Sequence, residues 1–241
     1  MTPHLTPRKE ITMALKNKYA PKTLDDLVID AANLHILKLM ASQQLKDHLL
    51  LEGTNGTGKT SIIELLPTLT FGTNYQIEEV MGHKDFVINE SVLNKWDNFI
   101  SWGRFQDQAS YILINEIDKI TANLPLFWQW LDSNRESVIV IGTTNQVLAI
   151  NKALRSRMKC LSLKPVTAIN MLPRALQIFA SEGLSIDESY LLSELKAVDA
   201  FGDIRKYLER MELVAIAIRS GEVNADGVLS TTPQRSLKRV K

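Results

Sequence analysis

Several features that would narrow the function are scarce in this 241-residue sequence. It has one cysteine, Cys160, so neither an intrachain disulfide nor a cysteine-ligated metal cluster is possible. The 28 basic and 27 acidic side chains leave a net charge of +1, so overall charge gives no argument for nucleic-acid binding. No apolar run approaches the ~20 residues of a membrane span, and the polar N-terminus lacks the apolar core of a signal peptide. We therefore expect a cytoplasmic protein that does not bind a membrane.

Short apolar runs alternate with segments of helical periodicity through the first two thirds of the chain. The predicted strands are 48–52, 74–81, 111–114, 138–141 and 160–163. The predicted helices between them are 30–45, 61–66, 89–103 and 122–132. Because the strand runs are continuously apolar and alternate with helices, they favour an α/β fold with a five-stranded parallel sheet that is covered on both faces.

The pattern changes after Pro165, where three helical stretches follow one another near 167–182, 187–198 and 203–219. No strand is predicted between them, which indicates a small helical domain. We therefore predict four parts: an N-terminal arm at 1–20, an α/β domain at 21–165, a helical domain at 166–222 and a basic tail at 223–241. The tail is polar, and its composition is typical of disorder.

A glycine-rich loop between a predicted strand and a predicted helix matches the pattern G-x-x-x-x-G-K-[ST] in full. Its glycines let backbone N–H groups wrap phosphates, and the following helix N-terminus adds its positive dipole end. Lys59 is expected to reach the β- and γ-phosphates, and Thr60 to bind Mg²⁺. The loop thus predicts that ATP and Mg²⁺ bind. The predicted nucleotide-binding residues are Gly53, Thr54, Asn55, Gly56, Thr57, Gly58, Lys59, Thr60 and Ser61.

The apolar run 111–114 ends in Asn115-Glu116-Ile117-Asp118. A P-loop ATPase needs an acidic group at the end of a neighbouring strand to hold Mg²⁺ and to polarise the attacking water. Glu116 is the predicted water-activating base, and Thr60, Asn115 and Glu116 are the predicted metal ligands. Asn115 stands where such sequences usually have Asp, and it brings no negative charge. The alternative is that Glu116 and Asp118 belong to a solvated loop.

Three further polar residues lie where they can contribute to phosphate chemistry. Asn145 follows a predicted strand on the ligand-binding edge of the sheet, although asparagine is also a common turn residue. Arg155 and Arg157 precede the last predicted strand, where the alternative is a solvated basic face. Arg205 begins a predicted helix and can either reach over the nucleotide or pair with Glu209, four residues later.

Together these motifs resemble the small subunits of replicative clamp loaders, a clade of AAA+ ATPases that includes replication factor C. Residues 18–28 resemble the family's Lys-Tyr-Arg-Pro and Leu-Asp-Asp-Val segment, with Ala20 in place of its arginine. The family's segment lies along the adenine, which implies base contacts from Tyr19, Pro21, Val28 and Ile29. The resemblance implies an AAA+ domain and a C-terminal helical lid.

The resemblance also assigns roles to the three polar residues. Asn145 matches the family's sensor-one asparagine. Residues 156–158 resemble its Ser-Arg-Cys motif, which implies that Arg157 is an arginine finger acting on a neighbouring subunit. Residues 202–206 are similar to the start of its sensor-two helix, which implies that Arg205 acts in cis. We thus expect Glu116, Lys59, Asn145 and Arg157 to be catalytic.

The resemblance implies an ATP-hydrolysing oligomer that acts on primer–template or duplex DNA with other AAA+ subunits, of the same or another kind, and with a sliding clamp. Lys84 and Lys119 are candidate DNA contacts, although a lone lysine is usually a solvated surface residue. The four tryptophans (Trp96, Trp102, Trp128 and Trp130) are expected to pack in the core or at a subunit interface.

Two other functions stay open. Clamp-loader subunits continue into a helical collar, whereas this sequence stops at residue 241, which favours a loader or regulator of another DNA machine, such as a helicase or a transposase. The second alternative is a nucleotide-gated scaffold, in which Asn115 leaves little hydrolysis.

Overall fold

Five parallel strands form the central sheet of the computed structural model, which describes residues 15–122 and 124–227. The spatial order is β2-β4-β6-β1-β7. This confirms the predicted α/β fold with a five-stranded parallel sheet. The strands are β1 (Leu49–Glu52), β2 (Tyr75–Met81), β4 (Ala109–Asn115), β6 (Val138–Thr144) and β7 (Lys159–Ser162).

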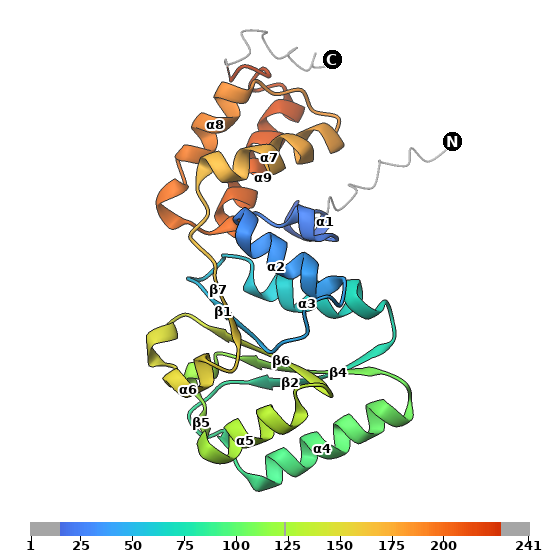
Figure 1. Ribbon diagram of the computed structural model, residues 1–241. Helices are drawn as coiled ribbons and strands as arrows, with labels where there is room; N and C mark the ends of the chain where they lie inside the picture. The colour runs from blue at the N-terminus through green and yellow to red at the C-terminus, as the bar shows by residue number, and fades with distance from the viewer. Residues whose placement is uncertain (1–14, 123, 228–241) are drawn as a thin grey trace, which may run out of the picture.

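Helices cover both faces of the sheet (Figure 1). One face carries α2 (Ala31–Ala41) and α3 (Lys59–Phe71), and the other carries α4 (Glu90–Phe105) and α5 (Leu124–Asn134). Side chains of β4 alternate between the two cores: Tyr111 and Leu113 pack in the core under α2 and α3, and Ile112 and Ile114 in the core under α4 and α5. Two buried faces are therefore the reason why the strand is continuously apolar.

Several short elements join the main ones. Strands β3 (Val87–Ile88) and β5 (Thr121–Ala122) pair in a separate parallel ladder that the sequence did not predict, because two residues carry no readable periodicity. The remaining short elements are α1 (Leu15–Lys18), α6 (Lys152–Arg155) and the 3₁₀ turns η1 (Leu24–Asp26), η2 (Ile117–Lys119), η3 (Val147–Ala149) and η4 (Asp199–Phe201).

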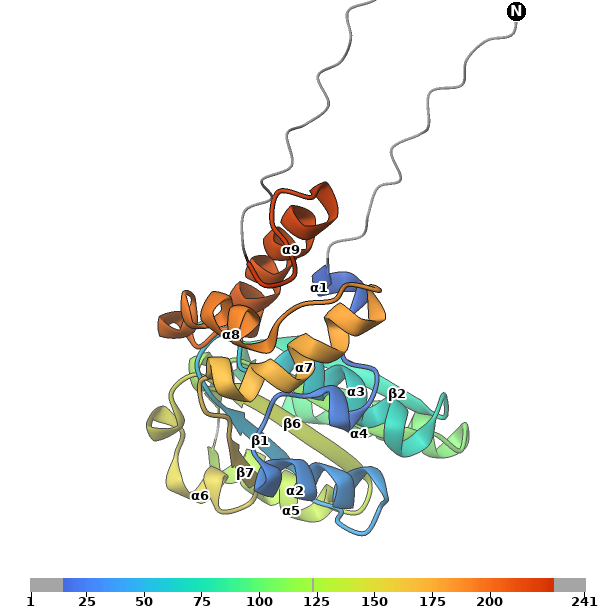
Figure 2. The same cartoon turned by 90° about the horizontal axis from the view of Figure 1, so that it is seen from above.

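Three helices follow the sheet: α7 (Ala168–Ser181), α8 (Glu188–Lys196) and α9 (Ile204–Ser220). They enclose a hydrophobic core of their own, which also includes Leu15 of α1. Figure 1 shows these three helices at the top of the molecule, and Figure 2 shows α1 beside α9. The predicted domain boundaries stay predictions, and residues 1–14 of the arm and 228–241 of the tail lie outside the described residues.

The described ranges contain no helix that is long and apolar enough to cross a membrane.

His48 is buried immediately before β1 and joins two elements. Its Nδ1 accepts a hydrogen bond from the Val140 N–H at 3.1 Å, so its Nε2–H donates to the Leu131 carbonyl at 3.3 Å. Burial lowers the pKa of His48, which keeps the ring neutral. The ring is therefore a structural link between β6 and α5.

The four tryptophans have different environments. Trp96 and Trp130 are core residues, as predicted, with ring centroids 5.3 Å apart. Trp128 is partly buried. Trp102, in contrast, is 60% exposed near the end of α4, and its ring lies 5.7 Å from that of Phe105, which is 79% exposed. This exposed pair is not part of the core.

Candidate nucleotide-binding site

A cavity of about 620 Å³ lies where the glycine-rich loop meets the N-terminal segment and the first turn of α9. This volume is in the usual range for small-molecule sites. Five parts of the chain contribute to its wall: residues 16–21, 26–29, 55–61 with Glu64, α7 and α9. The cavity brings together most of the residues predicted to bind nucleotide, namely Tyr19, Pro21, Val28, Ile29, Asn55, Gly56, Thr57, Gly58, Lys59, Thr60, Ser61 and Arg205.

The glycine-rich loop connects β1 to α3 and needs its glycines. Gly56 and Gly58 have φ angles of +76° and +95°, which L-residues with a side chain rarely adopt. A Cβ on Gly53 would lie 2.6 Å from the Leu163 carbonyl oxygen. Gly53 and the adjacent Thr54 are not among the residues that line the cavity, but both carbonyls face Lys59. An added Cβ would collide with its surroundings at Gly53 and Gly56, whereas at Gly58 the positive φ alone favours glycine.

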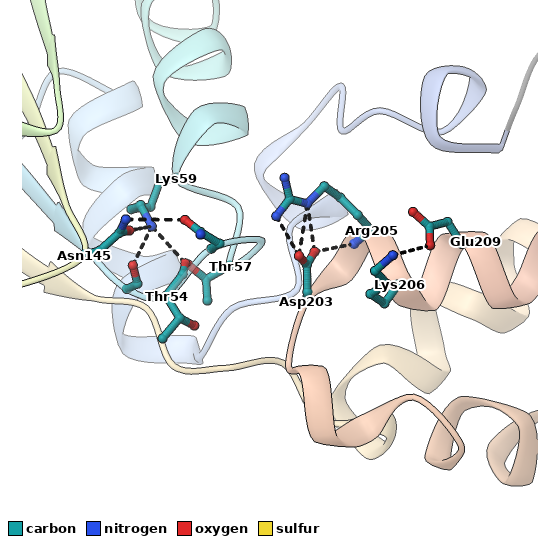
Figure 3. Close-up of polar contacts among 10 residues, drawn as sticks. Thr54, Thr57, Lys59, Asn145, Asp203, Arg205, Lys206 and Glu209 are labelled. Atoms are coloured by element: carbon teal, nitrogen blue, oxygen red, sulfur yellow. Dashed lines mark hydrogen bonds and ion pairs between the residues drawn. The ribbon is translucent and has the colours of Figure 1, made fainter. Parts of the chain in front are cut away.

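The Lys59 ammonium group is held by oxygens at the base of this loop (Figure 3). It donates to the carbonyls of Gly53 and Thr54 at 2.5 and 2.9 Å, and to Asn145 Oδ1 at 2.8 Å. Burial lowers the pKa of Lys59, and the nearby Arg205 charge lowers it further. Two cationic side chains therefore face the same space, which suits an anionic ligand. Asn145 directly follows β6 and contacts Lys59, because the carboxyl ends of the parallel strands β1 and β6 lie at the same edge of the sheet.

The acidic strand end has a specific hydrogen-bond network. Asn115 Nδ2 donates to Glu79 Oε1 at 2.8 Å, and Asn115 Oδ1 accepts from Thr143 Oγ1 at 3.3 Å. Glu116 has a positive φ of 54°, and its N–H donates to Thr143 Oγ1 at 3.0 Å. Its carboxylate pairs with Lys119 Nζ at 2.7 Å. Sequence reasoning missed Glu79, which lies on a different strand and belongs to no motif.

The oxygens near this strand end suit Mg²⁺ in kind. Thr60 offers a hydroxyl, Asn115 an amide oxygen and Glu116 a carboxylate, which are hard ligands. Glu79 places another carboxylate beside Asn115. In addition, one carboxylate oxygen of Asp118 is buried without a hydrogen-bond partner among the described residues. These oxygens are of the kind that Mg²⁺ binds, but the described residues hold no group of three or more Asp, Glu, His or Cys side chains that could bind a metal ion by themselves, and Asn115 carries no charge.

The start of α9 contacts the tip of the glycine-rich loop. The Ile204 N–H donates to the Gly56 carbonyl at 3.0 Å, and the Asp203 carboxylate lies where a Cβ on Gly56 would be, with Oδ1 only 1.9 Å from that position. Arg205 binds this carboxylate through Nε at 3.0 Å and through Nη2 at 2.6 Å. Burial opposes ionisation of Asp203, but the bonds from Arg205 outweigh it and lower the pKa.

These contacts correct one alternative for Arg205. It pairs with Asp203 rather than with Glu209, which instead accepts from Lys206 at 2.8 Å (Figure 3). Arg205 thus stays at the cavity and is bound by a neighbouring carboxylate.

Arg157 is not one of the cavity-lining residues. Its Nε bonds both oxygens of Asp132 at 2.9 and 3.0 Å, and its guanidinium lies 5.6 Å from the centroid of the Trp128 ring. The predicted DNA contacts Lys84 and Lys119 are both exposed.

The sequence is similar to a known ATPase family and to individual proteins. Residues 49–165 match AAA, the ATPase family associated with various cellular activities. The replication factor C small subunit of Archaeoglobus fulgidus is 29% identical over 219 residues, which cover 89% of this chain and 67% of the relative. Replication factor C subunit 5 of Arabidopsis thaliana is 26% identical over 210 residues, which cover 83% of this chain and 55% of the relative. The chain thus spans about two thirds or less of the length of these relatives.

A solved structure supports the fold. The RuvB Holliday junction branch migration motor of Thermotoga maritima superimposes with a TM-score of 0.57 over 88% of this chain and 76% of the RuvB chain. At 15% sequence identity, this likeness shows the fold alone.

Proposed function

Since this chain has the AAA P-loop fold and resembles the small subunits of replication factor C, we propose that it binds and hydrolyses ATP with Mg²⁺. The cavity carries the proposal: it unites the glycine-rich loop, Lys59, Arg205 and the segment 19–29 in one site. Lys59 and the loop N–H groups bind the phosphates, and the apolar part of the cavity receives the base.

Each polar residue then has a distinct task. Glu116 takes a proton from the attacking water, and Asn145, which already contacts Lys59, orients that water or the γ-phosphate. Arg205 leaves Asp203 to neutralise phosphate charge. Thr60, Asn115 and Glu116 hold Mg²⁺, which neutralises charge on the phosphate oxygens when it is bound.

A direct test measures binding and turnover separately. Lys59→Ala is expected to lose ATP binding, whereas Glu116→Gln keeps binding and loses hydrolysis. The control is Glu188→Gln, a change of the same kind at an exposed position on α8. If wild type binds ATP without any turnover, the enzyme proposal fails and the nucleotide-gated scaffold replaces it. The uncharged Asn115 is the observation that favours the scaffold.

We also propose that Arg157 completes the site of a neighbouring subunit. Support comes from its position: its side chain is 31% exposed and does not line the cavity of its own chain. Mixing Arg157→Ala chains with Glu116→Gln chains tests this, since each supplies what the other lacks. In a homo-oligomer, turnover should recover on mixing, because some sites combine an intact Glu116 with an intact Arg157. No recovery, with both variants binding ATP and assembling, would contradict action in trans between copies.

DNA replication is the proposed setting, since the relatives named above are replication factor C subunits. Lys84 and Lys119 are the proposed DNA contacts. A Cβ on Gly82 would lie 2.2 Å from the Glu116 carbonyl oxygen, so the segment before Lys84 packs against the acidic strand end. DNA bound here would therefore lie near the proposed base. Lys84→Ala should weaken DNA binding and leave turnover without DNA unchanged.

The exposed aromatic pair Trp102 and Phe105 is the proposed contact for a protein partner, for which a sliding clamp is the first candidate. Exposed apolar side chains that lie together commonly mark interaction sites. Trp102→Ala should reduce retention by an immobilised clamp with ATP present. Phe201→Ala, at a lid position that is 64% exposed, is the control. If Trp102→Ala and Phe201→Ala lower retention equally, or if neither lowers it, the aromatic pair is not the contact for the clamp.

A further inference from the structure

One face of α7 holds the N-terminal segment against the cavity. Arg174, Ile178 and Glu182 follow one another at intervals of four residues, so they lie on one side of the helix and its C-cap. Ile178 lines the cavity. The two flanking residues bind the segment that contains Tyr19. None of the motifs in the sequence includes this face.

Arg174 forms the first anchor. It pairs through Nη1 with Asp26, and the two side chains are only 14% and 17% exposed. Its Nη2 donates to the Tyr19 carbonyl at 3.5 Å. Arg174 and Asp26 both line the cavity. This anchor ties two points of the N-terminal segment to α7, the Tyr19 carbonyl and the Asp26 side chain, and Pro21 lies between them.

Glu182 forms the second anchor, and it holds a side chain rather than backbone. Tyr19 donates its hydroxyl to Glu182 Oε1 at 2.6 Å, and Lys18 Nζ lies 2.6 Å from the same oxygen. Arg219, in the last turn of α9, pairs with Oε2. The Glu182 side chain is 5% exposed. The bonds from Lys18, Tyr19 and Arg219 lower the pKa of Glu182 to about 2, so it is ionised at every ordinary pH.

The position of the Glu182 carboxylate lowers the stability of α7. Glu182 is the C-cap of α7, where the negative end of the helix dipole disfavours an anion. Lys18 and Arg219 compensate for it from two other parts of the chain. Among the described residues, this carboxylate is the acceptor to which the Tyr19 hydroxyl donates. The arrangement fixes the direction of the Tyr19 ring, which lines the cavity.

We propose that Glu182 is a positioning residue for the nucleotide base: it orients Tyr19 as a wall of the base pocket and ties that wall to α9 through Arg219. This rests on the proposed ATP binding. It predicts that Glu182 contributes to affinity only for ligands that carry a base, because Glu182 binds Tyr19 and Lys18 of the N-terminal segment and no residue of the glycine-rich loop.

The test compares binding of ATP with binding of inorganic tripolyphosphate, which has the phosphates and no base. Tyr19→Phe and Glu182→Ala are expected to weaken ATP binding about five- to tenfold, an effect of the size of one ordinary hydrogen bond, because the lost bond acts on ATP only through the position of the Tyr19 ring. Tripolyphosphate binding should not change. Glu182→Gln should retain part of the ATP affinity, since its amide oxygen still accepts from Tyr19. Glu188→Ala, at an exposed lid position, should leave both ligands unaffected.

The double variant Tyr19→Phe with Glu182→Ala should lose no more ATP affinity than the stronger single variant. Equal losses for ATP and tripolyphosphate would show that Glu182 is only structural, and unchanged ATP affinity in Tyr19→Phe would also overturn the inference. If wild type binds tripolyphosphate but gains nothing from the base, the positioning role fails while phosphate binding stands. If wild type binds neither ligand, the proposed function itself fails.

Discussion

Substitution of Gly56 by alanine tests the contact between the glycine-rich loop and the start of α9. Gly56 has a φ of +76°, a region in which a side chain costs about 1–2 kcal/mol. The new Cβ would meet Asp203 Oδ1 at 1.9 Å and Cγ at 2.0 Å. Ordinary contact needs about 3.5–4.0 Å, so the carboxylate must move by about 1.5–2 Å.

This movement has two consequences beyond backbone strain. It displaces the N-cap of α9 and strains the bond from the Ile204 N–H to the Gly56 carbonyl, which contributes about 1 kcal/mol. It also moves Arg205, which is bound to Asp203, away from the cavity. We expect Gly56→Ala to lower stability by about 2–3 kcal/mol and ATP affinity by at least about tenfold.

The matched control is Gly221→Ala. Gly221 has a similar φ of +72°, but nothing lies within 4 Å of its added Cβ. This variant should lose only the backbone part, about 1–2 kcal/mol, and keep its ATP affinity. Thermal unfolding should separate the two variants by several degrees, at about 2–4 °C per kcal/mol for a chain of this size. Equal melting temperatures and equal ATP affinities would refute the reasoning.

Three other predictions follow from single contacts. Lys119→Ala removes the partner that holds the Glu116 carboxylate, so ATP turnover without DNA should rise several-fold; an unchanged rate would show that this exposed pair does not restrain the base. His48 is buried and neutral in the folded chain, whereas in the unfolded chain it binds a proton below about pH 6.5. Urea denaturation below this pH should therefore show the free energy of unfolding falling by up to about 1.4 kcal/mol per pH unit, and His48→Gln should make this fall smaller. Asn115→Asp places a second carboxylate beside Glu79, so Mg²⁺ should raise the melting temperature of this variant more than that of wild type; an equal rise would mean that residue 115 does not face the metal.

Much of the fold could be predicted from the sequence because its signals are local. The apolar runs of β1, β4 and β6 and the glycines before Lys59 are contiguous patterns, and parallel strands bring their carboxyl ends to one edge. Asn145 could therefore be assigned to the neighbourhood of Lys59 before any contact was known. The resemblance to clamp-loader subunits added Tyr19, which has no local signal, and assigned Arg205 to the nucleotide rather than to Glu209; both residues line the cavity.

The contacts that hold these residues could not be predicted from local patterns. Glu79 reaches Asn115 from a strand 36 residues away, and Glu182 reaches Tyr19 across 163 residues. Such pairs depend on tertiary arrangement, and a carboxylate in a sequence does not reveal its partner. The spacing of Arg174 and Glu182 on α7 was visible, but nothing in the sequence showed what lies against that face. For Trp102 the sequence left core and subunit-interface packing open, because helical spacing alone does not show which face is covered; its exposure excludes the core.

We propose that this chain is an ATPase whose turnover is stimulated by DNA. The most direct measurement is steady-state ATP hydrolysis by wild type and Glu116→Gln, with and without primed DNA. The account predicts that DNA stimulates wild type and that Glu116→Gln binds ATP but shows no turnover under either condition. Wild type that binds ATP but does not hydrolyse it, with or without DNA, would contradict the claim.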